Sequence, residues 1–331
     1  MEVLYKEALA GADADAYDSF VDAAPGGHVA QTRAWAEVAV AGRPLTPRFF
    51  LARERGQVIG AALVLRARAG RIPAPAAHVE RGPVCARPDD VAKVAFALAR
   101  ATRRSGVARL TVMPYWSGDD AKRVERELAG ARFRSVQELD GAHTVTLRVD
   151  LAGRTDAEVF AGKEREVLRR KLRQAEKAGA KARRGGIDDL PTLERLHREL
   201  MASQGKHAKA HAWFAALGPA IVAGGARGAI FVCEDEANGN EPLAALFASR
   251  HGAIATFVLG AASSAPRTYS KMAPAMAAAI RWARDAGCTT FDLGGVPMDG
   301  DTDPKRAQIA QFKLDFAKTR VPLVGEHARW F

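Results

Sequence analysis

The chain has few cysteines and no long apolar segment. Its three cysteines, Cys85, Cys233 and Cys288, are widely spaced and odd in number. This pattern argues against a disulfide framework or a Cys-x-x-Cys metal site, and it fits a reducing compartment. No stretch approaches the roughly 18 consecutive apolar residues of a membrane-spanning helix. Because the first residues also lack the charged-then-apolar pattern of a signal peptide, we expect a cytoplasmic protein.

Several signatures of metal or covalent catalysis are missing as well. There is no Gly-x-Ser-x-Gly nucleophile elbow and no cysteine cluster. His207 and His211 are four positions apart, as two metal ligands on a helix would be, but no third ligand is close in the sequence. We therefore interpret them as exposed helical histidines and expect no metal site. Any chemistry should depend on positioning and on fixed charges.

Positive charge, in contrast, is in excess. The chain has 331 residues with 49 Lys and Arg against 38 Asp and Glu, which gives a net charge of +11. Such a surface concentrates polyanions such as nucleic acid, nucleotide diphosphates or anionic lipid. An arginine-rich composition with solvated side chains would give the same total, so the clustering of the charges must decide. The length predicts two domains of about 150 residues each.

The two halves share an order of elements. Phe50 and Phe231 each begin a strand–turn–strand unit, and Gly106 and Gly287 each separate a helix from a following strand; both pairs are 181 positions apart. Two features at one offset indicate a duplication. We predict an α/β (α+β) fold of two tandem domains, 1–150 and 151–331, each a mixed sheet flanked by helices. The element order resembles the acetyltransferase-like (GNAT) fold, used twice.

A basic helix opens the second half. Thr155 and Glu158 form a capping box, and the helical pattern continues to about Ala178. Between Lys163 and Arg184 there are ten Lys or Arg and three Glu. A solvated face with cations near the helix C-terminus is one interpretation. A phosphate-bearing partner is the interpretation we favour, because the acidic residues are too few to neutralise a row of three arginines: Arg165, Arg169 and Arg173.

The C-terminal region carries the strongest site signal. A short apolar strand ends in Asp292-Leu293-Gly294-Gly295, and two glycines there allow the backbone to approach a ligand closely. Lys313 follows Phe312 in an amphipathic turn, which suits a positioned cation better than a surface lysine. The corresponding strand of the first half has no Gly-Gly. We therefore expect the chemistry in the second half, with Asp292 either orienting an amine or capping the glycine turn.

Five segments in order resemble the Fem family (FemABX) of aminoacyl-tRNA-dependent peptidyltransferases, which carry two GNAT-like domains. They are His28–Trp35, Glu80–Val84, Leu168–Ala180, Phe291–Gly295 and Phe312-Lys313. The resemblance implies transfer of an amino acid from aminoacyl-tRNA to a peptidoglycan precursor peptide, with tRNA as co-substrate and no further cofactor. It also implies a monomer whose nucleotide- or lipid-linked acceptor could bring it into peripheral contact with the inner face of the membrane.

The resemblance assigns roles to individual residues. Lys313 would supply a cation at the reacting ester, supported by Phe312, with Asp292 beside it. The arginines of the basic helix would bind tRNA phosphates. The chain departs from the family in having Ala39 and Ala41 where a lysine is usual. The substrate-binding residues would be the following: Arg33, Trp35, Arg81, Lys206, Gly294 and Gly295.

Other functions remain open. An acyl-CoA-dependent N-acyltransferase could use the same fold, but the turn before Met272 lacks the two glycines that hold the CoA pyrophosphate in such enzymes. Transfer of an amino acid to a peptide natural product would need the same chemistry with another acceptor. An RNA-binding module without catalysis would need the basic residues but not the Gly-Gly and Phe-Lys pair.

Overall fold

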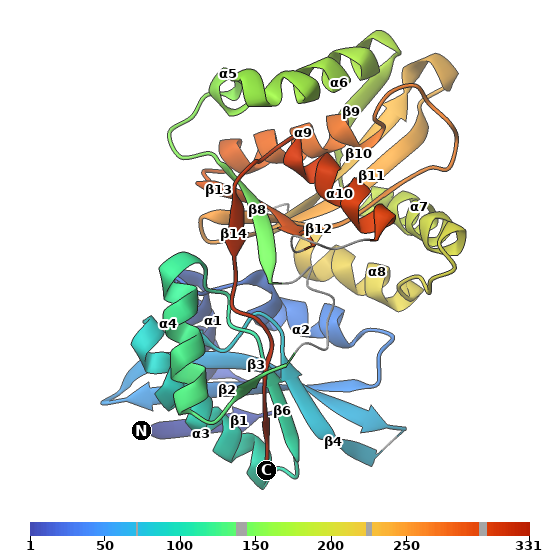
Figure 1. Cartoon of the computed structure of the whole chain (residues 1–331). Coiled ribbons are helices and arrows are strands. Elements are labelled where there is room, and N and C mark those ends of the chain that lie inside the picture. The colour runs from blue at the N-terminus through green and yellow to red at the C-terminus, as the bar shows by residue number, and fades with distance from the viewer. Residues whose placement is uncertain (71, 137–143, 223–226, 298–302) are drawn as a thin grey trace. The chain divides into compact units, whose positions relative to one another are not determined.

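The computed structural model describes the whole chain except residues 71, 137–143, 223–226 and 298–302. It divides into two compact units, Met1–Val145 with Val321–Phe331, and Thr146–Arg320. Each unit is one mixed sheet flanked by helices (Figure 1), which confirms the predicted fold class. All three cysteines are buried and unpaired. Among the described helices, none combines the length and hydropathy needed to span a bilayer.

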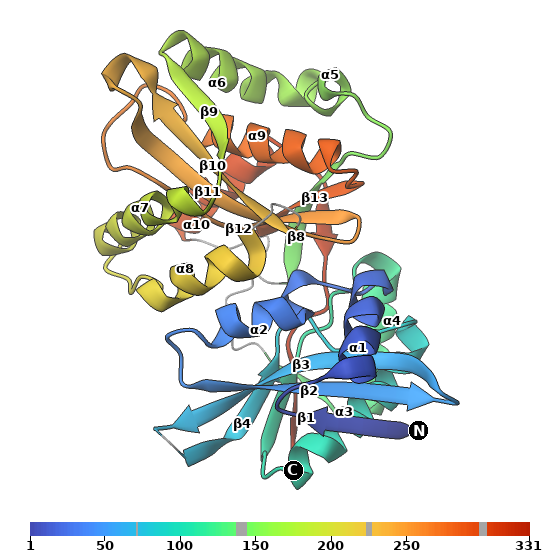
Figure 2. The same ribbon diagram turned by 180° about the vertical axis from the view of Figure 1, so that it is seen from behind.

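The first unit buries both faces of its sheet. Helices α1 (Gly11–Ala23) and α3 (Val91–Arg104) lie on opposite faces of the sheet (Figure 2). Phe50 and Val64 pack with α3 in one core. On the other face, Tyr17 of α1 meets Phe49 edge-on, with 5.5 Å between ring centroids. Its elements are β1 (Glu2–Lys6), α1 (Gly11–Ala23), α2 (Arg33–Val40), β2 (Leu45–Glu54), β3 (Gln57–Ala69), β4 (Ile72–Val79), β5 (Val84–Cys85), α3 (Val91–Arg104), β6 (Arg109–Val112), α4 (Gly118–Gly130), β7 (Arg134–Ser135) and β15 (His327–Trp330).

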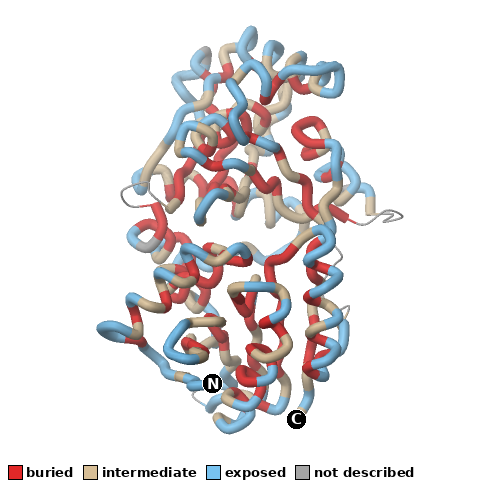
Figure 3. Tube along the Cα trace, turned by 90° about the vertical axis from the view of Figure 1, so that its left-hand side faces the viewer, coloured by how far each residue is buried: buried red, intermediate tan, exposed pale blue. Residues whose placement is uncertain are grey.

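The second unit has the same kind of core. Strands β10 and β11 are buried along most of their length, because α9 packs against the sheet and α7 packs against β11 and β12 (Figure 3). Its elements are β8 (Val145–Asp150), α5 (Asp156–Val159), α6 (Glu166–Lys177), β9 (Ala180–Gly185), α7 (Leu190–Ser203), α8 (His211–Leu217), β10 (Gly228–Asp235), β11 (Glu241–His251), β12 (Ile254–Ala262), α9 (Met272–Asp285), β13 (Thr290–Gly295), α10 (Pro304–Leu314) and β14 (Arg320–Pro322).

The two sheets follow one plan. The strand order is β1-β2-β3-β4-β6-β15-β7 in the first and β9-β10-β11-β12-β13-β8-β14 in the second. In each, one parallel pair, β4 with β6 or β12 with β13, lies among antiparallel neighbours. Gly106 and Gly287 have positive φ angles of 85° and 79° at the equivalent helix-to-strand turns, a conformation that favours glycine. The duplication inferred from the sequence is therefore visible as matched topology.

The units also exchange one strand each. β8 follows β7 in the chain but pairs between β13 and β14 in the second sheet, and β15 follows β14 but pairs between β6 and β7 in the first. His327 of β15 lies 181 positions after Thr146 of β8, so the exchanged strands are themselves repeats. The sequence prediction ended the first domain at 150. Strand pairing instead gives residues 146–150 to the second sheet and the last eleven residues to the first unit.

The predicted basic helix is two helices. The capping box of Thr155 and Glu158 is present and begins α5, but α5 ends at Val159. Gly162 has a positive φ of 89°, which no helical residue adopts, so the chain turns before α6 begins at Glu166. The uninterrupted helix that the sequence pattern suggested is therefore wrong at this point. The break places the carbonyl groups of Phe160 and Gly162 within hydrogen-bond reach of Arg169 on α6.

Candidate active site

The parallel strands of the second unit part at the predicted site. β12 and β13 pair from Ile254 with Thr290 as far as Thr256 with Asp292, and β13 has no registered pairing with β12 beyond that point. In the first unit the equivalent strands stay paired through Val79 and Val112. Of these two described strand pairs, only β12 and β13 of the second unit separate at their ends. The Gly-Gly pattern predicted this opening in the second half.

Asp292 holds this turn in place. Its buried carboxylate accepts hydrogen bonds from the Thr146 hydroxyl and, at 2.7 Å, from the Gly294 amide. Arg148 forms an ion pair with it at 3.3 Å. Gly294 needs a positive φ of 75°, and a Cβ there would lie 3.3 Å from the Phe257 carbonyl oxygen. Asp292 therefore caps the glycine turn, the more structural of the two roles considered for it.

Lys313 is buried at the same strand end. Only 6% of it is exposed, and its Nζ donates a hydrogen bond of 2.7 Å to the Gly295 carbonyl oxygen. The Nζ also lies 5.6 Å from the centroid of the Phe257 ring. Burial lowers the pKa of Lys313 to about 8, although the nearby Asp292 opposes the shift. A buried amine with its pKa close to neutrality is typical of functional lysines rather than of surface ones.

The turn of helix that carries Lys313 is fixed from two sides. Phe312 packs edge-on against Phe316, with 5.3 Å between ring centroids. Asp315 is 2% exposed, and its carboxylate receives the Nζ of Lys171 from α6 at 2.6 Å. This ion pair ties the basic helix to the segment that holds Lys313. Sequence reasoning missed Asp315, because nothing in its local pattern names a partner 144 positions away.

Lys171→Met should destabilise the second unit by about 2–3 kcal/mol, because it leaves the Asp315 carboxylate buried and unpaired. We expect less than the roughly 3–5 kcal/mol of a fully buried pair, since Lys171 is partly exposed. Urea unfolding would measure the change. Arg170→Met is the matched control, because Arg170 is exposed on the same helix. Equal losses in the two variants would refute the role of the pair.

Two predicted substrate residues of the first unit have structural partners. The Arg33 guanidinium contacts the Asp18 carboxylate through two nitrogens, at 3.0 Å and 2.6 Å. Trp35 lies on α2, and because it is only 7% exposed it packs in the hydrophobic interior. Neither is presented as a bare ligand-binding group, so their part in substrate binding stays a prediction that would require the Arg33–Asp18 pair to open.

Arg81 lies in a well-defined loop. The motif residue Gln31 is fully buried, donates to the Glu80 carbonyl and accepts from the Leu63 amide, so it joins the two N-terminal motifs. The loop continues through the cis peptide Gly82-Pro83. The Arg81 guanidinium lies 5.6 Å from the centroid of the Tyr115 ring. The two motifs that the sequence analysis linked only by family resemblance are therefore adjacent in space.

The remaining candidates lie on the surface of the second unit. Lys206 is exposed in the loop after α7. His211 pairs with Glu194 at 2.8 Å, and the described residues contain no group of three side chains that could hold a metal. Arg165 is half-buried, and burial lowers its pKa. Arg169 donates to the carbonyls of Phe160 and Gly162 at 3.0 Å and 2.8 Å, which caps the turn between α5 and α6.

Of the predicted arginine row, Arg173 is the exposed member. Its exposed neighbours on α6 are Arg170 and Lys177, at helical spacings of three and four residues. None of these three cations makes an ion pair within the described parts of the chain. The surface available to phosphate is thus the face formed by Arg170, Arg173 and Lys177, which we call the α6 basic face. Of the three predicted arginines, Arg173 is thus exposed on α6, beside two cations that the predicted row did not include.

The comparison with protein families agrees with this geometry. The FemAB family model matches residues 13–219, which is more than half of the chain. The chain belongs to the FemAB family. A second model, the acetyltransferase (GNAT) domain, matches residues 162–306 of the second unit. The resemblance inferred from the five motifs is confirmed, and with it the assignment of the protein as an acyltransferase.

Solved structures confirm the duplicated fold. The crystal structure of FemX is 17% identical with a TM-score of 0.81, covering 100% of this chain and 98% of that one. L-PGS from Bacillus licheniformis is 16% identical with a TM-score of 0.60, covering 95% and 90%. A tandem GNAT protein from the clavulanic acid biosynthesis pathway is 14% identical with a TM-score of 0.57, covering 99% and 98%. No protein of curated function matches the sequence.

Proposed function

We propose that this FemAB-family enzyme transfers an amino acid from aminoacyl-tRNA to an amine of a peptidoglycan precursor peptide in the cytoplasm. The acceptor nitrogen attacks the ester carbonyl carbon, the bond to the tRNA ribose oxygen breaks, and the amine proton leaves with that oxygen or with water. In this proposal the cation of Lys313, which is held at the Gly295 carbonyl, stabilises the negative charge of the tetrahedral intermediate. Family membership and the similarity to FemX support this class of reaction.

The observation that favours tRNA over CoA is the N-terminus of α9. GNAT enzymes that use CoA bind its pyrophosphate with free amides at this helix start. Here Ser270 accepts the Ala273 amide at 3.3 Å, and Pro274 has no amide hydrogen to offer. Lys271 turns inward and donates to the carbonyls of Ser263 and Ala265, the latter at 2.7 Å. At this helix start, the Ala273 amide and the Lys271 ammonium group are therefore already engaged within the chain.

The α6 basic face supports a phosphate-rich donor. Changing Arg170, Arg173 and Lys177 together to Met should raise KM for aminoacyl-tRNA about tenfold or more at low salt. It should also reduce the slope of log KM against log salt by about 2, since each lost phosphate contact accounts for about 0.7–0.9. kcat should change little, because none of these three side chains is among the described contacts of Lys313.

The matched control for this prediction is a triple change on α4, where Lys122, Arg123 and Arg126 are three exposed cations of one helix. It removes the same net charge and should leave the salt slope unchanged. If both triples weaken tRNA binding equally, the effect comes from net charge, and the α6 basic face has no special role.

A transfer assay with labelled aminoacyl-tRNAs, set beside acetyl-CoA consumption, tests the function itself. We expect labelled product from tRNA with a peptidoglycan precursor peptide and none from acetyl-CoA. Transfer from acetyl-CoA alone would establish the competing N-acyltransferase function. Transfer from tRNA to another peptide but not to the precursor would keep the reaction and change the acceptor.

A further inference from the structure

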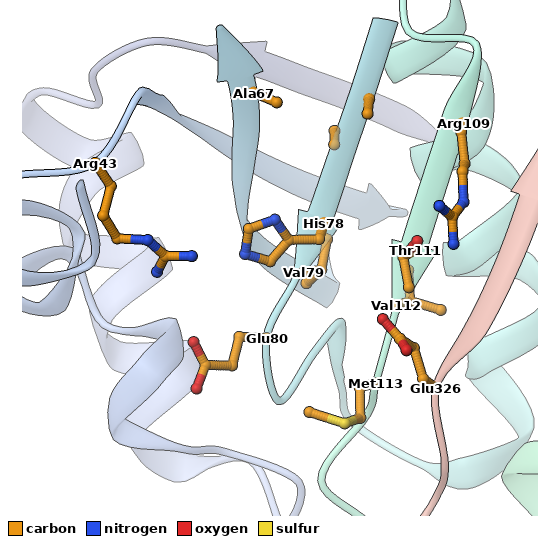
Figure 4. Close-up of a pocket in the computed structure, with 12 residues that line it drawn as sticks. Arg43, Ala67, His78, Val79, Glu80, Arg109, Thr111, Val112, Met113 and Glu326 are labelled. Carbon is orange, nitrogen blue, oxygen red and sulfur yellow. The ribbon is translucent and has the colours of Figure 1, made fainter. Parts of the chain in front are cut away.

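The first unit contains a pocket that the sequence analysis did not identify. Its volume is about 410 Å³, and it lies on one side of strands β3, β4 and β6 (Figure 4). This size is within the roughly 300–1,000 Å³ range of small-ligand sites. The lining residues that matter here are Arg43, Ala67, Ala76, His78, Glu80, Arg109, Thr111 and Glu326.

Strand alternation builds the pocket. Ala76, His78 and Glu80 are alternate residues along β4 and just beyond it, so they share one face of the sheet. Arg109 and Thr111 do the same on β6, in register beside them. The intervening Ala77, Val79, Leu110 and Val112 are buried in the hydrophobic core of this unit. The alanines leave room in the floor, and the long charged side chains form the walls.

Each side of the pocket carries one positive and one negative side chain. Arg43 and Glu80 lie on one side of His78, and Arg109 and Glu326 lie on the other (Figure 4). His78 is half-buried, and its pKa is lowered mainly by burial, with Arg43 adding to the shift and Glu80 opposing it. The ring is therefore neutral at pH 7 and adds no charge. The pocket thus contains side chains of both signs, and among them Arg43 and Glu80 are exposed.

This mixture selects a chemical class of ligand. Two carboxylates repel phosphate and other polyanions, and two guanidinium groups repel polyamines. A guanidinium binds a carboxylate through two parallel hydrogen bonds, and a carboxylate binds an ammonium group. The small apolar floor formed by Ala67 and Ala76 suits a short aliphatic chain. A ligand with an amine and a carboxylate on one carbon has a partner for each sign of charge in the pocket.

We propose that this pocket binds the zwitterionic end of an amino acid and so selects acceptors that carry a free amine beside a free carboxylate. The carboxylate would contact the Arg43 guanidinium, and the ammonium group would contact the Glu80 carboxylate. The role in acceptor selection rests on the proposed aminoacyl transfer. The binding of a zwitterion does not, because it needs only the pocket.

Three matched probes test the binding on the full chain: L-norleucine, hexanoate, which lacks its amine, and pentylamine, which lacks its carboxylate. Ligand-observed NMR or calorimetry at pH 7 should show norleucine binding about tenfold or more tighter than either single-charge probe. Arg43→Met and Glu80→Gln should each weaken norleucine binding about fivefold or more. Both residues are exposed at the pocket mouth, so these variants should fold.

Arg195→Met is the control, because Arg195 is an exposed arginine of α7, paired with Glu199, outside the pocket. It should bind norleucine as the unmodified chain does. Equal binding of hexanoate and norleucine would overturn the proposal, as would full binding by both pocket variants. Tighter binding of inorganic pyrophosphate at the same residues would make the pocket an anion site and would also overturn it.

The transfer assay separates this proposal from the function on which it rests. A chain that binds norleucine but transfers nothing from aminoacyl-tRNA would refute the proposed function and leave the zwitterion site standing. A chain that transfers equally well to acceptor peptides with and without a zwitterionic side-chain end would refute the selective role. A preference for the zwitterionic acceptor that Glu80→Gln abolishes is the expected result.

Discussion

Lys313→Met should lower kcat for aminoacyl transfer by about 10²–10³-fold, the usual loss when one fixed group that stabilises an oxyanion is removed. Lys313 is the buried cation at the parted ends of β12 and β13, held at 2.7 Å from the Gly295 carbonyl. Methionine has a similar length and no charge, so the fold should be retained. Single-turnover transfer with saturating aminoacyl-tRNA would measure the chemical step apart from binding.

The pH dependence of the activity shows whether Lys313 acts as a cation or as a neutral amine. Burial lowers the pKa of Lys313 to about 8, so the side chain is mostly charged at pH 7 and mostly neutral above pH 9. If the cation stabilises the transition state, activity should fall as the pH rises through about 8. Lys313→Arg should lack this fall, because a guanidinium stays charged. Activity that rises through pH 8 in a Lys313-dependent manner would instead make the neutral amine a base.

A control variant separates charge from position in the chain. Lys318 is exposed just after the same helix, so Lys318→Met removes a charge nearby without touching the strand ends. It should keep full activity. Full activity of Lys313→Met, with unfolding unchanged in both variants, would remove Lys313 from the catalytic site even if the transfer reaction itself is confirmed.

The same pKa has a consequence for stability. In the unfolded chain a lysine has a pKa of about 10.4, so between pH 8 and 10 the unfolded state binds more protons at this site than the folded state does. Stability from this group therefore increases as the pH rises through that window. Lys313→Met should remove this increase, which gives a check on the burial of the side chain that needs no substrate.

The candidate site around Gly295 and Lys313 could be predicted from the sequence because its signal is local. A glycine pair after an apolar strand, and a lysine between phenylalanines, are both contained in short segments, and the structure brings Gly295 and Lys313 into contact. The partners of other candidates depend on turns and packing that no short motif encodes. Arg33 pairs with Asp18, and Arg169 with the carbonyls of a turn that depends on the positive φ of Gly162. No spacing rule identifies such partners.

The pocket of the first unit was not predicted from the sequence, for a related reason. Its polar residues alternate on two strands, His78 with Glu80 and Arg109 with Thr111, and alternation predicts only that they share a face. β4 and β6 are neighbours because the chain crosses over between them through α3. The sequence predicts this helix, but it does not predict which residues of the two strands lie opposite each other. A site formed across strands therefore needs the pairing to be known.

The strand exchange limited the prediction of domain boundaries. The strand that ends at Asp150 looks from its sequence like the last strand of the first domain, because it follows that domain's elements directly. Its registered partner is instead β13, with Phe291 opposite Val149. Thr146 of β8 and His327 of β15 lie at the repeat offset of 181 positions, but an alternating strand pattern carries no information on which of two similar sheets it joins. Topology, rather than chain order, decides the boundary.

A chain that ends at Val324 should fail to fold its first unit. It keeps β14 but lacks β15, whose residues His327 to Trp330 pair with β6 on one side and whose His327 and Ala328 pair with β7 on the other. Ala328 is fully buried. Losing an interior strand removes several hydrogen bonds of about 1 kcal/mol each together with its buried surface. The sum approaches the roughly 5–15 kcal/mol that stabilises a whole domain.

Hydrogen exchange followed unit by unit would measure the result. Amides of β6 and α3 should lose protection in the truncated chain, whereas amides of β13 and α9 should keep it, because the second sheet retains β8 and β14. A synthetic peptide of residues 325–331 added to the truncated chain should restore protection to β6, since it supplies the missing strand. Unchanged protection of β6 without the peptide would mean that β15 only covers an edge, and that the first sheet is complete without the exchanged strand.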